Sequence, residues 1–205
     1  YEEPWPEAFS GIGKRRARKT GLIEQESADY IAKLLQEQDV NLGKEEQDML
    51  QEAIRGTIPG FSPELKTVIQ PHVSADSHPV VWAVAAADLA SAGTHPEHFL
   101  KDGDDVFRED RMLPPLETLD EATLQKVYDE VIGWRASQVT YAQGQKQYWN
   151  REAVPAFIKS KLTEFDKSIA LCQNRLERRR ALYNNTLSIR ENTRILLDDM
   201  QFRRY

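Results

Sequence analysis

All four histidines of this chain of 205 residues lie in one short stretch, together with two aspartates. The stretch contains His72, Asp76, His78, Asp88, His95 and His98. Imidazole nitrogens and carboxylate oxygens are the ligands that hold zinc, manganese or iron in proteins, provided that they converge on one point. The residue types therefore predict a divalent metal ion, with Mn, Fe, Zn and Mg as the candidates.

Asp88 is the residue of this stretch that a surface position explains least well. It follows the apolar run 80–87, and on a helix Trp82, Ala85 and Leu89 would lie within about one turn of it. A carboxylate in such surroundings is costly unless it has a cation, a metal ion or a good hydrogen-bond partner. Asp88 is therefore a candidate metal ligand. The alternatives are a cap on a neighbouring helix or an ion pair with an arginine.

The element that positions Asp88 is a predicted helix over residues 79–91, which stops at Gly93. Its residues are apolar almost all round, so we expect it to be a buried central helix. His78 precedes this helix and lies ten residues before Asp88, which corresponds to about 15 Å along a helix. That separation is too long for both side chains to bind one ion, and the helix entry explains His78 better.

The other histidines fall into two groups. His95 and His98 follow Gly93 in a segment that we expect to be a surface loop. The position of His72 relative to Asp88 depends on an intervening turn. His72 is therefore kept as the second candidate metal ligand.

The spacing of apolar residues predicts an all-α fold, a helical bundle that ends in two long helices. Helices are expected from about residue 22, after Gly43 and after Ser62, whereas residues 94–113 are expected to be loop. A further helix begins near residue 120, with Gly133 and Gly144 as candidate interruptions. The last long helix is indicated by apolar positions that mostly alternate four and three residues apart, namely Ile158, Leu162, Phe165, Ile169, Cys172, Leu176, Tyr183 and Leu187.

These elements predict two parts. Residues 1–113 would form a core of short helices, and residues 114–205 would form a long antiparallel helical pair. Long helices with an apolar seam are typical of helix–helix packing between chains as well as within one. A homodimer through the C-terminal helices is therefore one expected assembly.

Composition excludes several classes of protein. The single cysteine, Cys172, rules out an internal disulfide framework and a cysteine-rich zinc module, and its place on the apolar seam indicates core packing. No apolar run approaches the roughly 20 residues of a membrane span, and no cleavable signal pattern is present. We therefore expect a cytoplasmic protein. The net charge of −6 argues against broad nucleic-acid binding.

The remaining charged clusters have simple explanations. Lys14, Arg15 and Arg16 belong to a basic run before the first helix, and they are either candidate contacts for a substrate phosphate or part of a surface loop. The segment Asp102–Asp104 is expected to be a solvated turn. The arginines of the last long helix are expected on its outer face, with the third of them interrupting the seam: Arg175, Arg178, Arg179 and Arg180.

Three short motifs occur in an order that is similar to a known family. They are Glu26-Ser27-Ala28, Ala53-Ile54-Arg55-Gly56-Thr57, and Ala86-Ala87-Asp88-Leu89 followed by Ala92-Gly93. Over roughly residues 20–93, the chain resembles the second half of the HD-domain superfamily of metal-dependent phosphohydrolases. The resemblance implies an all-helical domain whose metal is held by a histidine, by a His-Asp pair on a later helix, and by a final aspartate.

Carried over residue by residue, the resemblance assigns one ligand, because Asp88 matches the final aspartate. No histidine of this chain is followed by aspartate, so the His-Asp pair is absent. In the family the earlier ligands precede the Glu-Ser helix, and the sequence begins at Tyr1 rather than at methionine. We therefore expect the first half of the domain to be missing from this chain. A degenerate domain without the family's metal site is the alternative.

Two functions follow from these observations. The first is an HD-type metal-dependent phosphohydrolase or phosphodiesterase that acts on a small phosphorylated substrate such as a nucleotide. The second is a catalytically inactive, HD-like helical protein that serves interaction or dimerisation.

Overall fold

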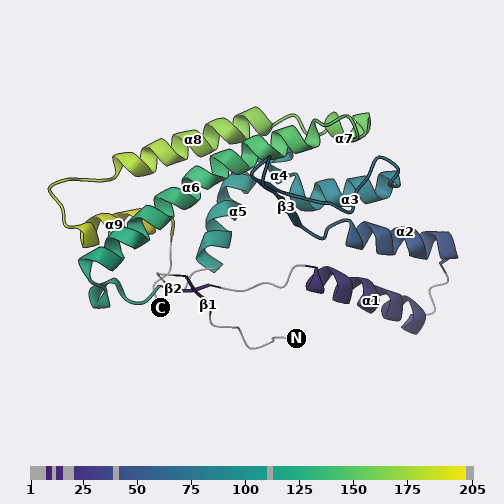
Figure 1. The fold of residues 1–205 in the computed structure, drawn as a ribbon, viewed down its shortest axis with the longest axis horizontal. Coiled ribbons are helices and arrows are strands. Elements are labelled where there is room, and N and C mark those ends of the chain that lie inside the picture. The colour runs from purple at the N-terminus through teal and green to yellow at the C-terminus, as the bar shows by residue number, and fades with distance from the viewer. Residues whose placement is uncertain (1–7, 11–12, 16–20, 39–41, 110–112, 202–205) are drawn as a thin grey trace. The chain divides into compact units, whose positions relative to one another are not determined.

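The computed structural model describes residues 8–10, 13–15, 21–38, 42–109 and 113–201, most of which are helical (Figure 1). The predicted all-α fold class is confirmed. The strands in these ranges are short and form two separate antiparallel pairs, β1 with β2 and β3 with β4. None of the described helices combines the length and the apolar composition that a membrane span requires.

The described residues group into two compact units. Unit 1 takes its residues from 1–18, 97–139 and 168–205, and unit 2 from 19–96 and 140–167. The long helices α6 (Glu121–Trp149) and α8 (Phe165–Ala181) each contribute to both units. The units do not coincide with the parts 1–113 and 114–205 expected from the sequence.

Unit 2 contains the stretch that carries the candidate ligands. Its shorter elements are α1 (Leu22–Glu37), α2 (Lys44–Arg55), β3 (Gly60–Ser62), β4 (Thr67–Ile69), α3 (Pro79–Leu89), α4 (Ser91–Thr94) and α7 (Ala156–Lys159). Helix α2 packs against both α1 and α3 (Figure 1). Gly43 caps its start, because the Gly43 backbone N–H donates to the Glu46 carboxylate at 2.8 Å. Helix α3 begins with proline at its first position.

The β3–β4 hairpin corrects the helix expected after Ser62. It packs on α6 at Gly144, where an added Cβ would lie 2.3 Å from the carbonyl oxygen of Leu65. Gly144 therefore permits a close approach of two backbones and does not interrupt α6. The amide of Gln145 on α6 donates to the Val68 carbonyl at 2.6 Å and to the Thr67 hydroxyl at 3.0 Å. These contacts fix the hairpin against the second half of α6.

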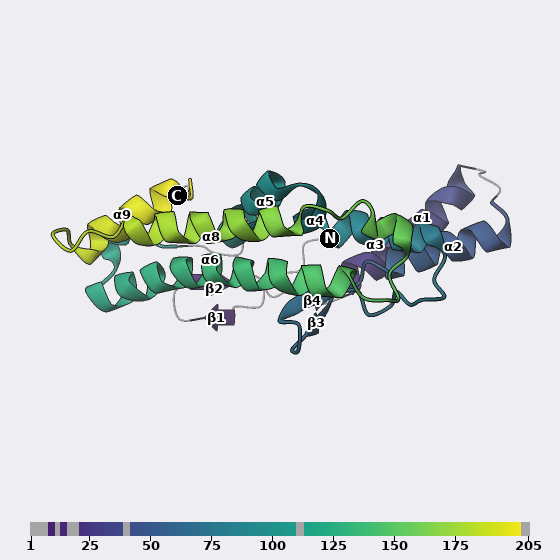
Figure 2. The ribbon, with the colours of Figure 1, turned by 90° about the horizontal axis from the view of Figure 1, so that it is seen from above.

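Unit 1 contains β1 (Ala8–Ser10), β2 (Gly13–Arg15), α5 (Pro96–Glu109), a 3₁₀ turn η1 (Leu116–Thr118) and α9 (Ile189–Asp199), together with parts of α6 and α8. The two long helices run antiparallel and side by side in both views (Figures 1 and 2). A cluster of buried apolar side chains lies in this unit, namely Phe107, Leu116, Leu124, Val127, Tyr128, Val131, Leu196, Leu197 and Met200. Cys172 is also buried, as its place on the seam predicted.

Two sequence predictions about this region are wrong. The segment expected to be loop, 94–113, contains helix α5. The last long helix does not extend over the whole apolar seam, because it begins at Phe165 and ends at Ala181, and α7 and α9 are separate elements.

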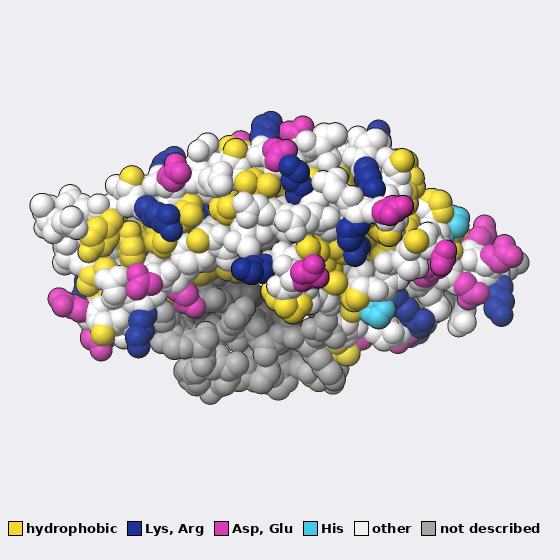
Figure 3. All heavy atoms as spheres, turned by 45° about the horizontal axis from the view of Figure 1, so that its top comes forward, with side chains coloured by type: hydrophobic (Ala, Val, Ile, Leu, Met, Phe, Trp, Pro, Cys, Tyr) yellow, Lys and Arg dark blue, Asp and Glu magenta, His cyan; other side chains and the backbone are white. Residues whose placement is uncertain are grey.

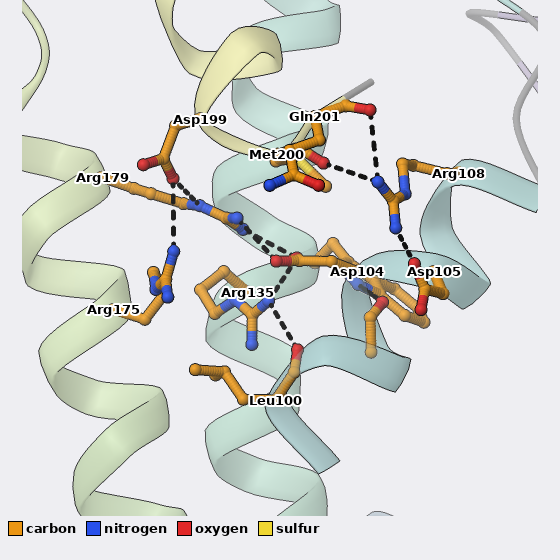
Figure 4. A network of polar contacts seen from close by, with 12 residues as sticks. Leu100, Asp104, Asp105, Arg108, Arg135, Arg175, Arg179, Asp199, Met200 and Gln201 are labelled. Carbon is orange, nitrogen blue, oxygen red and sulfur yellow. Dashed lines mark hydrogen bonds and ion pairs between the residues drawn. The ribbon is translucent and has the colours of Figure 1, made fainter. Parts of the chain in front are cut away.

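A network of buried ion pairs joins α5, α6, α8 and α9 (Figure 4). The side chains of Arg135 and Arg179 are 0% exposed, and both contact the carboxylate of Asp104. Arg179 donates to both oxygens of Asp104, at 3.0 and 2.8 Å, and to Asp199 at 2.9 Å. A bidentate pair of this kind is stronger and more directional than a single hydrogen bond. Asp104 thus neutralises charge from two helices at once.

The network overturns the expectation that Asp102–Asp104 is a solvated turn and that Arg179 lies on an outer face. Both Asp104 and Arg179 are inside the unit because each supplies the charge that the other requires. Arg175 and Arg178, with side-chain exposures of 30% and 65%, lie at the rim and pair with Asp199.

The two buried arginines differ in how well they are compensated. Burial lowers the pKa of Arg135, which has no hydrogen-bond partner for Nε and Nη1 within the described part of the chain. Burial also lowers the pKa of Arg179, but hydrogen bonds and charge from Asp104 and Asp199 outweigh it and the net shift is upward. Asp104 is therefore the anion on which both guanidinium groups depend.

We predict that Asp104→Ala lowers the free energy of unfolding by about 3–5 kcal/mol, because it leaves two buried cations without their shared anion. The matched control is Asp105→Ala on the same helix, since Asp105 is 32% exposed and pairs with Arg108. That control should cost at most about 1 kcal/mol. Urea unfolding of the full chain measures both, and equal losses would contradict the assigned role of Asp104.

Candidate functional site

Asp88 lies in the last turn of α3, at the edge of an apolar stripe on that helix. The stripe consists of Val80, Ala83, Val84 and Ala87, all of which are exposed, and Val80 and Val84 are 41% and 36% exposed. The opposite face of α3 buries Val81, Trp82 and Ala85. The helix was expected to be buried all round, and this expectation is wrong because nothing among the described residues covers the stripe.

Exposed apolar side chains occur at several places among the described residues, for example Ile23, Tyr30 and Leu34 on α1. Figure 3 shows hydrophobic side chains that reach one surface of the protein between charged ones, which is ordinary for a folded protein. The members of the α3 stripe follow the helical spacing of i, i+3, i+4 and i+7, so they form one face. A continuous apolar face of this kind is typical of a surface that another polypeptide covers.

Gln70 provides the hydrogen bond to the Asp88 carboxylate. Its side-chain nitrogen Nε2 donates to Oδ2 of Asp88 at 3.0 Å. Gln70 follows β4 and is 1% exposed. Among the described residues Asp88 neither pairs with an arginine nor caps a neighbouring helix, because its carboxylate accepts from the Gln70 side chain and from no Lys, Arg or helix N–H. Its partner is a neutral amide.

The backbone of Gln70 is itself fixed by Tyr148 of α6. The Tyr148 hydroxyl accepts from the Gln70 N–H at 3.2 Å and donates to the Gln70 carbonyl at 3.1 Å. Next along α6, Trp149 stacks edge-on against Trp82 of α3, with ring centroids 6.3 Å apart, and its indole N–H donates to the side-chain oxygen Oε1 of Gln145 at 2.7 Å. The hairpin, α3 and α6 therefore meet in a buried polar layer that ends at Asp88.

The ionised form of Asp88 is disfavoured in these surroundings. Burial of the carboxyl group raises the pKa of Asp88, the hydrogen bond from Gln70 lowers it, and the charge of Glu24 on α1 raises it, with a net upward shift. The residue as a whole is exposed on α3. Burial and the charge of Asp88 also raise the pKa of Tyr141.

The four histidines do not gather around Asp88. His72 lies on an exposed turn after β4, and its role as second ligand stays a prediction. The His78 ring caps α3, because its Nδ1 accepts from the Val80 N–H at 3.2 Å. His95 and His98 are exposed, at the end of α4 and within α5. Across the described ranges no three His, Cys, Asp or Glu side chains form a group that could hold a metal ion.

The predicted phosphate contacts lie at the limit of what the structure describes. Lys14 and Arg15 belong to strand β2, whose backbone is described, and Arg16 lies outside the described residues. Their role therefore stays a prediction. Comparison of the chain with protein families, with curated proteins and with solved structures gives no match.

The sequence did not single out Gln70 or Tyr148. Glutamine and tyrosine are common in helices and loops, so neither residue type indicates a site. The contact between Gln70 and Tyr148 joins positions that are 78 residues apart in the chain. One signal was present in the sequence, namely the polar Gln70 directly after the apolar pair Val68-Ile69.

We predict that Asp88→Asn raises the melting temperature at neutral pH. Asp88 has a raised pKa in the folded protein, so stability falls as pH rises from the unfolded-state pKa of about 3.9 through the folded value. Above that window the ionised carboxylate destabilises the fold, and the asparagine variant lacks this penalty. The difference between the two proteins should vanish in acid, as thermal unfolding at several pH values would show.

The control for this prediction is Asp120→Asn, which should have the opposite sign. Asp120 accepts from the Thr123 side chain and backbone N–H, and these bonds lower its pKa. Its ionised form therefore stabilises the start of α6. A fall in melting temperature for Asp88→Asn at neutral pH would contradict the assignment of Asp88 as an uncompensated carboxylate.

Proposed function

We propose that this chain carries one metal ligand, Asp88, of an HD-type metal-dependent phosphohydrolase that acts on a phosphoester such as a nucleotide. The observation that carries the proposal is the setting of Asp88 at the edge of the exposed α3 stripe, held by a neutral amide. The resemblance of residues 20–93 to that superfamily assigns the same residue as a ligand.

The charge balance supports a ligand role. A carboxylate that forms a structural ion pair has its charge neutralised within the protein, as Asp104 does. Asp88 has no such partner among the described residues, and its pKa is raised. A bound cation would remove the penalty of keeping this group ionised. The donor chemistry therefore fits Asp88 as one ligand, although the described residues do not complete a site by themselves.

The exposed stripe supports the rest of the proposal. Additional helices that pack on Val80, Ala83, Val84 and Ala87 would bury these side chains and would bring further ligands next to Asp88. When bound, the ion would supply Lewis-acid activation of water for attack on the phosphoester. Lys14, Arg15 and Arg16 are proposed as contacts for the substrate phosphate.

We predict that the native full-length protein binds Mn²⁺ and hydrolyses a general phosphoester, and that Asp88→Ala removes both properties. Metal content after gel filtration and the release of p-nitrophenol from its phosphate ester measure them. The matched control is Asp76→Ala, which removes an exposed carboxylate from the same stretch and should change neither. If Asp88→Ala keeps the metal content and the activity of the unchanged protein, the proposal is wrong.

A second candidate is a non-catalytic helical interaction or dimerisation protein. The uncovered α3 stripe favours it, because a continuous apolar face on a helix also binds a partner without any chemistry. The homodimer through the C-terminal helices belongs to this candidate, and Ile195 on α9, at 37% exposure, is an apolar group on that side.

Sedimentation velocity separates these two surfaces. If copies associate through α3, Val84→Glu should convert a dimer to a monomer, and Ile195→Glu should leave the dimer intact. The reverse pattern would assign dimerisation to the C-terminal helices. A protein that is monomeric at all concentrations tested would exclude the dimerisation function.

A further inference from the structure

We infer that the exposed α3 stripe binds the α3 stripe of a second copy of this chain in antiparallel orientation. In this arrangement His78 of each copy donates a hydrogen bond to Asp88 of the other. The inference rests on the second candidate function, in which the chain dimerises, and does not require a metal ion at Asp88. It names the occupant of the stripe and the register in which that occupant binds.

The stripe is matched to a copy of itself. Val80 and Ala87 are its two ends, and its midpoint lies between Ala83 and Val84. When two such helices lie antiparallel around a two-fold axis at this midpoint, Val80 of each copy lies opposite Ala87 of the other, as an isologous contact requires. The alanines are small, so the two helix axes can approach to the usual distance of about 8–10 Å.

His78 and Asp88 lie at opposite ends of α3 and equally far from its centre. His78 is the N-cap of the helix and Asp88 lies in its last turn. The midpoint between these two residues falls at Ala83, within one residue of the midpoint of the stripe. The two-fold axis that joins the apolar stripes therefore also brings His78 of one copy opposite Asp88 of the other. This coincidence of two centres favours a second copy over an unlike helix as the occupant.

The two end groups have complementary hydrogen-bonding atoms. Both residues are exposed. Nδ1 of His78 accepts from the Val80 N–H at 3.2 Å, so the neutral ring carries its proton on Nε2, which has no acceptor among the described residues. Asp88 accepts from Gln70 through Oδ2, and no described group donates to Oδ1. One copy therefore offers a donor and the other an ionised acceptor.

The antiparallel orientation also offsets the charge of Asp88. A carboxylate in the last turn of a helix lies at the negative end of the helix dipole. Burial of the carboxyl group and the charge of Glu24 raise the pKa of Asp88, which shows that its ionised form is disfavoured in the single chain. The positive N-terminal end of a second α3 would lie beside this carboxylate. Association would thus supply the opposite charge that the described residues of one chain do not.

The size of the stripe sets the expected strength of the dimer. Four short side chains do not by themselves supply the roughly 800 Å² per partner that a standard stable interface buries. We therefore expect a weak dimer whose population rises with protein concentration. A covalent trap detects such a dimer better than gel filtration does.

The register is tested by disulfide formation between cysteines placed on the stripe of the full chain, whose own Cys172 is buried. Val80→Cys and Ala87→Cys replace exposed side chains. In an antiparallel pair these two cysteines face each other. Two copies of the same variant keep their thiols roughly 10 Å apart along the helix, which is too far for a disulfide.

We expect an oxidised mixture of the two variants to form linked dimer at least about tenfold faster than either variant alone, because reaction within a complex is effectively intramolecular. Non-reducing gel electrophoresis measures these rates. Ala83→Cys lies beside the axis, so this single variant should link to itself. The control for random collision is Phe61→Cys, which replaces a side chain that is 65% exposed on the β3–β4 hairpin and should not link.

The contact at the helix ends is tested by His78→Asp, introduced into both stripe variants. Aspartate is also a good N-cap, so α3 keeps its start. The new carboxylate would face Asp88 of the second copy, and repulsion should slow linking in the mixture to the rate of the single variants. The matched control, His78→Asn, keeps the cap and a side-chain donor and should link normally. Adding Asp88→Asn to His78→Asp removes the repulsion and should restore linking.

Each outcome decides a different point. If Val80→Cys links to itself as fast as to Ala87→Cys, or if His78→Asp leaves linking unchanged, the inference is wrong although dimerisation through α3 stands. If no stripe variant links faster than Phe61→Cys while sedimentation shows a dimer, the dimer uses another surface and the inference alone fails. A protein that neither links nor dimerises removes the second candidate function and the inference together.

Discussion

A buried charge requires a partner of opposite charge, and this requirement organises unit 1. The guanidinium groups of Arg135 and Arg179 are fully buried, and Asp104 contacts both of them. Asp199 completes the coordination of Arg179. Four helices are thereby held at one point, because the desolvation cost of each ion is offset only when all of them are in place.

The same requirement identifies Asp88 as a different kind of residue. Its carboxylate is partly desolvated like that of Asp104, but its partner is the uncharged amide of Gln70. The burial of Asp104 is therefore explained by its contribution to the stability of the fold. The second carries an electrostatic cost that the described residues do not offset, and perturbed carboxylates of this kind are concentrated at functional sites. The contrast between the two supports the proposal that Asp88 is a metal ligand.

Local sequence patterns predicted some parts of this arrangement well and others poorly. The all-α class and helix α3 were predictable, because apolar periodicity and the proline at its start are local signals. Helix α5 was missed, because Gly103 and the acidic residues around it resemble a turn. What overrides that preference is the ion pair of Asp104 with arginines that come 31 and 75 residues later. No local pattern contains that information.

For the candidate site, too, local sequence patterns predicted some features and missed others. The sequence by itself determined that Asp88 follows an apolar helix, that one cysteine and four histidines limit the available ligands, and that no histidine is followed by aspartate. Only the tertiary structure decided that His78 is a helix cap, that one face of α3 is exposed among the described residues, and that the amide of Gln70 donates to Asp88. The physical reason is that helix formation depends on neighbours a few residues apart, whereas the charge state and the orientation of a carboxylate depend on groups that folding brings to it from distant parts of the chain.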